Sequence, residues 1–159
     1  MSVAVCAVPT MPEETTAKPM AQLTLRSQLD DLDQLWPWVE ALAAEYSIPA
    51  GTTFAIHLCL EEAVSNVIRH GYGNQPGHTV TVDCSLSETR ELVFTVEDQA
   101  PAFDPLGNQP SQTDAAPSSI DDLLPGGRGI HLLARFAGSV AYHRLANGNR
   151  LTIGFLLPA

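Results

Sequence analysis

Residues 61–72 read EEAVSNVIRHGY, and this stretch says more about fold and function than any other in the chain. A helix turns about 100° per residue, so four of its polar residues share one arc of roughly 100°: Glu62, Asn66, Arg69 and His70. The opposite arc is apolar throughout and holds Ile56, Leu60, Ala63, Val64, Val67 and Ile68. The sequence therefore predicts an amphipathic helix over about residues 53–70 with one buried face.

The polar face of this helix carries groups with distinct chemical uses. The carboxylate of Glu62 can accept a proton, the amide oxygen of Asn66 can ligate Mg²⁺, and a cation such as Arg69 can contact phosphate. Taken alone, the same pattern also describes the solvated face of an ordinary amphipathic helix.

Two later stretches add to this pattern. Asp98 ends a predicted strand and begins a long loop, where its carboxylate can accept a hydrogen bond from an exocyclic amine such as that of adenine. Residues 126–129, GGRG, precede a predicted short helix, and free amides at a glycine-rich helix start can hold phosphate. The plainer explanations are a turn that favours aspartate and a flexible loop in which Arg128 is merely exposed.

Hydrophobic patterning predicts the remaining elements. Strands are expected at 21–26, 79–86, 91–97, 139–144 and 150–156, and helices at about 29–46, 53–70 and 130–136. Pro37 predicts a kink or a new start in the first helix, and Thr52 or Thr53 is the expected cap of the second. Antiparallel hairpins and segregated helices predict an α+β two-layer sandwich, with a mixed, mostly antiparallel sheet and helices on one face.

Composition limits the classes of protein. The 159 residues are 45% hydrophobic and 16% charged, with a net charge of -10, which argues against general binding to nucleic acid. No apolar run reaches the roughly eighteen residues of a membrane span. The three cysteines form no C-x-x-C pair, and no basic residue precedes the apolar stretch at 3–8, so a cytoplasmic location is expected. Residues 1–20 are predicted to be a disordered tail and 21–159 a single domain with a lid at about 104–125.

The order of these features resembles the nucleotide site of the GHKL ATPases, which include gyrase-type and histidine-kinase ATP domains. The resemblance is strongest to the stand-alone anti-sigma-factor serine/threonine kinases of bacterial partner-switching systems. Four stretches carry it: EEAVSNVIRHGY at 61–72, EDQAPAFDP at 97–105, PGGRGIHLL at 125–133 and NGNRLTI at 147–153. It spans most of the chain from about residue 21 onward.

The resemblance implies a role for each matching residue. Glu62 matches the general base, Asn66 the Mg²⁺ ligand and Asp98 the carboxylate that reads the adenine amino group. The residues matched to the rest of the ATP site are Arg69, His70, Gly127, Arg128 and Gly129 near the phosphates and Thr152 beside the adenine pocket. The family usually shows Asp-x-Gly-x-Gly where this chain has Ala100 and Ala102, and because alanine disfavours positive φ, a shifted loop is predicted.

The resemblance also implies a function and its partners. They are an ATP- and Mg²⁺-dependent protein kinase, usually a homodimer, that phosphorylates a STAS-type anti-sigma factor antagonist and sequesters a sigma factor or analogous regulator. The two alanines leave open a non-catalytic module that acts by sequestration alone. A detached histidine-kinase ATP domain ranks lower, because no helical segment with a phospho-accepting histidine is expected upstream.

Overall fold

The computed structural model describes residues 19–102, 133 and 135–158, and the structural statements below concern these residues. Strand β1 spans Ala21–Arg26 and is followed by a 3-10 helix, Leu29–Gln34, by α1, Leu35–Tyr46, and by α2, Ala50–Asn66. A π-helical turn, Val67–Gly71, extends α2. Strands β2, Thr79–Leu86, β3, Glu91–Asp98, β4, Ser139–Leu145, and β5, Gly148–Leu156, complete the fold.

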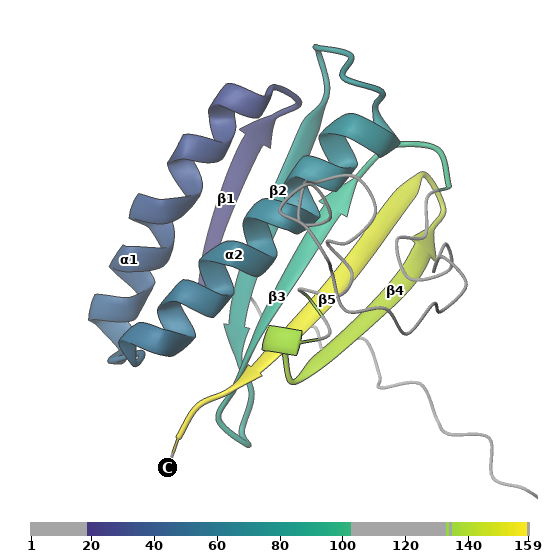
Figure 1. Cartoon of the computed structure of the whole chain (residues 1–159). Helices are drawn as coiled ribbons and strands as arrows, with labels where there is room; N and C mark the ends of the chain where they lie inside the picture. Colours follow the sequence, from purple (N-terminus) through teal and green to yellow (C-terminus); the bar gives the residue numbers. More distant parts are fainter. Residues whose placement is uncertain (1–18, 103–132, 134, 159) are drawn as a thin grey trace, which may run out of the picture.

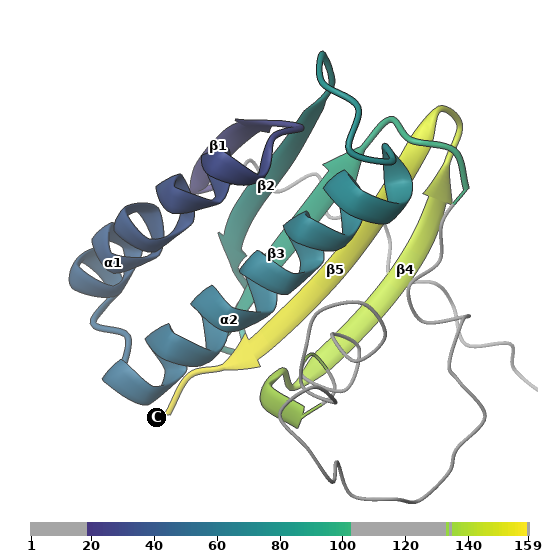
Figure 2. The same cartoon turned by 45° about the horizontal axis from the view of Figure 1, so that its top comes forward.

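The five strands form one sheet in the order β1-β2-β3-β5-β4. All four pairings between neighbouring strands are antiparallel, so the described sheet lacks the parallel pair that a mixed sheet would have. Both helices lie on the same face of the sheet (Figures 1 and 2). The predicted α+β two-layer sandwich is therefore confirmed.

The core lies between the helices and the inner face of the sheet. Period-two alternation buries Leu92, Phe94 and Val96 on β3, and the Phe94 ring meets that of Phe155 edge-to-face at 6.0 Å. The predicted apolar arc from Ile56 to Ile68, on α2 and the π-helical turn, is buried in full. Cys59 and Cys84 are buried free thiols, and burial raises the pKa of each to about 12.

The first residues of α1 and α2 test two predictions made from the sequence. Pro37 is the third residue of α1, where a missing N–H costs no helical hydrogen bond, so it marks a new start and not a kink. The predicted cap at Thr52 or Thr53 is wrong, because α2 begins at Ala50 after Pro49. The Thr53 N–H donates to the Pro49 carbonyl at 2.9 Å, and the Thr53 hydroxyl donates to the same carbonyl at 2.9 Å.

The last turn of the predicted helix at 53–70 has π geometry. The Tyr72 N–H donates to the Val67 carbonyl five residues earlier, at 2.8 Å. Single π-helical turns within helices occur frequently at functional sites. This turn lies directly after Asn66. In the described ranges, neither helix combines the length and apolar character needed to cross a membrane.

Candidate functional site

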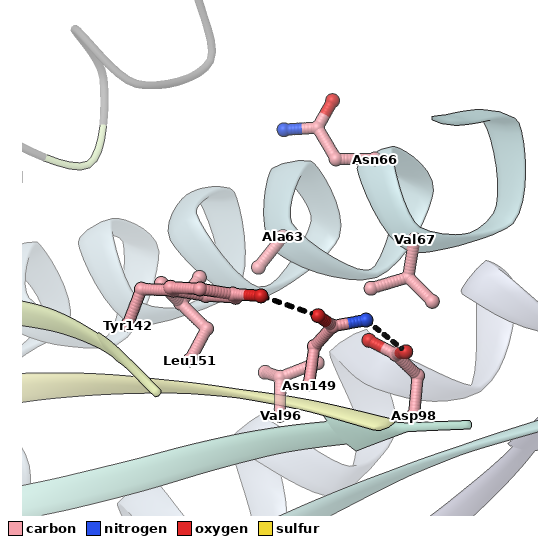
Figure 3. A pocket seen from close by; sticks show the side chains of 8 residues that line it. All are labelled: Ala63, Asn66, Val67, Val96, Asp98, Tyr142, Asn149 and Leu151. Carbon is pink, nitrogen blue, oxygen red and sulfur yellow. Dashed lines mark hydrogen bonds between the residues drawn. The ribbon is translucent and has the colours of Figure 1, made fainter. Parts of the chain in front are cut away.

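A pocket opens between the second half of α2 and the adjoining ends of three strands (Figure 3). Its cavity volume is about 20 Å³, so the space between the walls is narrow. The lining residues are Ala63, Asn66 and Val67 from the helical segment, Val96 and Asp98 from β3, Asn149 and Leu151 from β5, and Tyr142 from β4. The walls are mostly apolar, and few polar groups converge on them, as is typical of small-molecule sites.

Asp98 is the carboxylate of this pocket, and it is only 8% exposed. Its Oδ1 accepts hydrogen bonds from Asn149 Nδ2 and from the Ala100 N–H, both at 2.8 Å. The second carboxylate oxygen makes neither bond and lies on the pocket side in Figure 3. Burial raises the pKa of Asp98, and the hydrogen bonds oppose this shift without cancelling it.

Asn149 holds the loop that follows Asp98, and the sequence alone did not identify it. Besides Asp98, its Nδ2 donates to the Ala100 and Pro101 carbonyls at 3.2 and 3.1 Å. Its Oδ1 accepts from the Tyr142 hydroxyl and from Arg144 Nη1, and the Arg144 guanidinium also donates to the Ala100 carbonyl at 2.9 Å. These partners fix the amide with its nitrogen toward Asp98.

The loop after Asp98 has alanine at positions 100 and 102, where the family usually has glycine. Neither Ala100 nor Ala102 has positive φ, so neither alanine is strained by a left-handed backbone, and the predicted shift of the loop stays a prediction. Ala100 is buried beside the π turn, where a Cβ added to Gly71 would lie 3.1 Å from the Ala100 Cβ. The extra methyl group therefore packs closely against the end of the helical segment.

Glu62 lies on the flank of α2 and is half-buried. Among the described residues, its Oε1 is buried and has no hydrogen-bond partner. Burial raises the pKa of Glu62, while attraction from Arg69 and hydrogen bonding with Asn66 act in the opposite direction. A buried carboxylate oxygen without a partner costs stability, and such groups are typical of sites that a ligand completes.

The sequence matches the family model described as a histidine kinase-like ATPase domain over residues 25–155. The chain belongs to this family. It is 32% identical to the serine/threonine-protein kinase BtrW of Bordetella bronchiseptica over 73% of this chain and 79% of that protein. It is 31% identical to an anti-sigma F factor of Oceanobacillus iheyensis over 54% of this chain and 56% of that protein. The GHKL resemblance seen in the sequence is thus confirmed.

A solved structure supports the fold of this ATPase domain. The RsbU and RsbW domains of a Mycobacterium tuberculosis protein superpose with a TM-score of 0.59 at 15% identity. The match covers 87% of this chain but only 33% of that one, so the chain spans about a third of the longer protein's length. At this identity the likeness concerns the fold alone.

The ATPase domain brings together some of the predicted site residues. Asn66 and Asp98 line one pocket, and the amide of Asn66 points away from the Asp98–Asn149 pair in Figure 3. Arg69 is half-buried and His70 exposed on the turn after Asn66. The predicted phosphate loop, Gly127, Arg128 and Gly129, and the predicted lid at 104–125 lie outside the described residues.

Thr152 does not line the pocket, contrary to its predicted place beside the adenine. It stands between the buried Leu151 and Ile153 on β5, so strand alternation puts it on the outer face of the sheet. Its cross-strand neighbours there are Thr95 and Ala141. The β5 residues that line the pocket are Asn149 and Leu151.

The two buried carboxyls predict how stability depends on pH. Burial raises the pKa of Asp98 above 3.8 and that of Glu62 above 4.5. The folded state therefore binds these protons more tightly, and the stability this contributes is lost as the pH rises through the folded pKa values. We expect the free energy of unfolding of Asp98→Asn to gain on that of the unmodified chain between about pH 4 and pH 7. Urea denaturation across this range measures the free energy of unfolding of the variant minus that of the unmodified chain, and a difference that falls with rising pH would contradict the expectation.

Proposed function

We propose that this chain binds ATP with Mg²⁺ in the pocket between α2, β3 and β5 and transfers the γ-phosphate to a serine or threonine hydroxyl of a partner protein. The observation that carries the proposal is the buried Asp98, held by Asn149 with one oxygen while the other faces an apolar pocket. Family membership and the kinase name of one relative point the same way.

The adenine end of the nucleotide would occupy this apolar pocket. Ala63, Val96 and Leu151 supply walls for a flat ring, and the pocket-side oxygen of Asp98 can accept a hydrogen bond from the adenine amino group. Guanine has a carbonyl oxygen at the corresponding ring position, which a carboxylate repels. The site should therefore prefer ATP to GTP.

The residues present would fit a magnesium ion that comes with the nucleotide and needs few protein ligands. No cluster of three or more histidine, cysteine, aspartate or glutamate residues occurs within the described part of the chain. Mg²⁺ in nucleotide sites typically takes one or two protein oxygens and fills its shell with phosphates and water, and the Asn66 amide at the pocket rim can supply one. When bound, the ion would offset the negative charge of the phosphates.

Glu62 is the residue best suited to act on the accepting hydroxyl. Its Oε1, which has no hydrogen-bond partner among the described residues, can accept the hydroxyl proton as the new phosphorus–oxygen bond forms and the bond from the γ-phosphate to ADP breaks. This contact would orient the nucleophile toward the γ-phosphate. Burial raises its pKa toward neutrality, which strengthens it as a base. Arg69, whose charge attracts Glu62, stands on the same flank and can contact a phosphate.

The proposed partners follow from the names of the relatives and from the sequence resemblance. One relative is named an anti-sigma F factor, and we propose that this chain also holds a sigma factor or analogous regulator. The phosphate acceptor would be a STAS-type antagonist protein. We further propose that residues 21–159 form one ATP-binding domain that acts in the cytoplasm as a homodimer.

A thermal shift followed by a transfer assay tests the function. Saturating Mg-ATP should raise the unfolding temperature, since a ligand at 100 times its dissociation constant adds about 2.7 kcal/mol of stability. Incubation with labelled ATP and a candidate antagonist should then label the antagonist. Binding without transfer to any candidate would favour the sequestering module, and no thermal shift at millimolar ATP would refute the nucleotide site.

Asp98→Asn is expected to weaken ATP binding by about 10- to 100-fold, in line with the loss of a hydrogen bond to a charged group. The asparagine oxygen can keep the bonds from Asn149 and Ala100, which turns an NH₂ group toward the pocket, and this group cannot accept a hydrogen from adenine. The same NH₂ group can donate to a guanine carbonyl, so the preference for ATP over GTP should fall. Calorimetric titration with both nucleotides measures the two effects.

Asp83→Asn is the matched control for this change. Asp83 lies on β2 with its carboxylate bonded to Gln22 at 2.7 Å, on the sheet face away from the pocket. The control should bind ATP like the unmodified chain. An equal loss of ATP affinity in both variants, or unchanged ATP binding by Asp98→Asn, would show that Asp98 does not contact the adenine.

A further inference from the structure

The end of α2 is joined to the loop after Asp98 through one hydroxyl group. Tyr72 follows the π turn and is only 7% exposed. Its hydroxyl accepts a hydrogen bond from the Gln99 N–H at 2.8 Å and donates one to the Thr79 carbonyl at 2.8 Å. Gln99 is the residue directly after Asp98, so this bond holds the backbone beside the pocket carboxylate.

The Tyr72 ring is itself fixed in place. It stacks on the His78 ring with centroids 4.5 Å apart and an angle of 4° between the planes. The backbone of His78 is tied to Ser27 by two hydrogen bonds, one at 2.9 Å and one at 3.1 Å. The Tyr72 N–H is bonded to the Val67 carbonyl, so both the backbone and the ring of Tyr72 are restrained.

This junction matters because the two ends of the pocket come from different elements. Asn66 belongs to α2, whereas Asp98 ends β3. The facing residues Ala63, Val67 and Val96 are apolar, and apolar packing alone is not directional. The partly buried hydrogen bond from Gln99 to Tyr72 adds the missing directional restraint.

We infer that Tyr72 is a positioning residue for nucleotide binding. Its hydroxyl sets the place of the Asp98 loop relative to α2, and so the spacing between the base end and the phosphate end of the site. The inference rests on the proposed function, because it assumes that a nucleotide spans both ends. Tyr72 itself does not line the pocket.

Tyr72→Phe tests this role because it removes the hydroxyl and keeps the stacked ring. We expect the dissociation constant for Mg-ATP to rise roughly fivefold to tenfold. In an Asp98→Asn background the same change should have less than about a twofold effect, because the carboxylate being positioned is gone. A merely structural tyrosine would weaken binding equally in both backgrounds, and that result would overturn the inference. Tyr46→Phe on α1 is the matched control and should bind like the unmodified chain.

Amide hydrogen exchange tests the junction without nucleotide. In Tyr72→Phe the Gln99 amide should exchange about tenfold faster or more, while the amide of Phe94 in the middle of β3 should keep its rate. Unchanged exchange at Gln99 would overturn the inference. Normal ATP binding by Tyr72→Phe would overturn the inference and leave the proposed function standing. No ATP binding by the unmodified chain would overturn the proposed function and, with it, this inference.

Discussion

Glu62→Gln is expected to slow phosphate transfer by about 10²- to 10⁴-fold while changing the dissociation constant of Mg-ATP less than about twofold. Glutamine has nearly the same shape as glutamate but cannot take a proton from the accepting hydroxyl. Glu62 is absent from the lining of the Asp98 pocket, so adenine should bind there as before. Single-turnover transfer to the antagonist and calorimetric titration with ATP measure the two quantities separately.

The same variant is expected to be more stable than the unmodified chain at neutral pH. The buried Oε1 of Glu62 has no partner in the described part of the chain, and burial raises its pKa, so its charge is a cost to the folded state. Replacing the charge with a neutral amide reduces that cost. A gain in unfolding temperature together with lost transfer is the combination that a functional group produces, and a structural one does not.

Glu61→Gln is the control for Glu62→Gln. Glu61 is exposed, adjacent in sequence, and pairs with His57 at 3.6 Å on another side of the helix. The Glu61→Gln variant should transfer phosphate at the same rate as the unmodified chain. If Glu62→Gln also transferred normally, proton transfer to Glu62 would have no part in the reaction, whatever the affinity for ATP.

The sequence predicted those features that depend on local periodicity. Leu92, Phe94 and Val96 recur at every second position, and they lie on the inner face of β3 as expected. The same reasoning applied to β5 would have placed Thr152 outside, because Leu151 and Ile153 are the apolar positions. The role given to Thr152 came from the family resemblance, and the parity of the strand contradicts it.

The features that escaped prediction depend on contacts between distant segments. Asn149 lies just before the predicted strand at 150–156, and only the register that places it opposite Asp98 reveals its bond to that carboxylate. The accommodation of Ala100 likewise depends on Gly71, which no local pattern relates to it. Composition and spacing record neither register nor packing, so these parts of the site needed the structure.

Gly148→Ala is expected to destabilise the fold by about 3 kcal/mol and to weaken ATP binding at least about 100-fold. A Cβ at this position would lie 1.8 Å from the Asp98 carbonyl oxygen, 2.9 Å from the Asp98 carbonyl carbon and 3.1 Å from the Gln99 Cα. All three atoms are backbone, so no side chain can rotate away and the end of β3 must move. That movement would carry Asp98 away from Asn149, the residue directly after the substituted glycine.

Two other glycines provide graded controls for Gly148→Ala. A Cβ on Gly51 meets nothing within 4 Å, so Gly51→Ala in α2 should leave stability unchanged or raise it by up to about 1 kcal/mol. A Cβ on Gly154 would meet the side-chain ends of Glu91 and Ser139, which can rotate, so Gly154→Ala should cost less than Gly148→Ala. Urea denaturation and ATP titration of the three variants test this order. If Gly148→Ala matched Gly51→Ala in both measurements, the close approach of β5 to the Asp98 loop could not be what holds the carboxylate in the pocket.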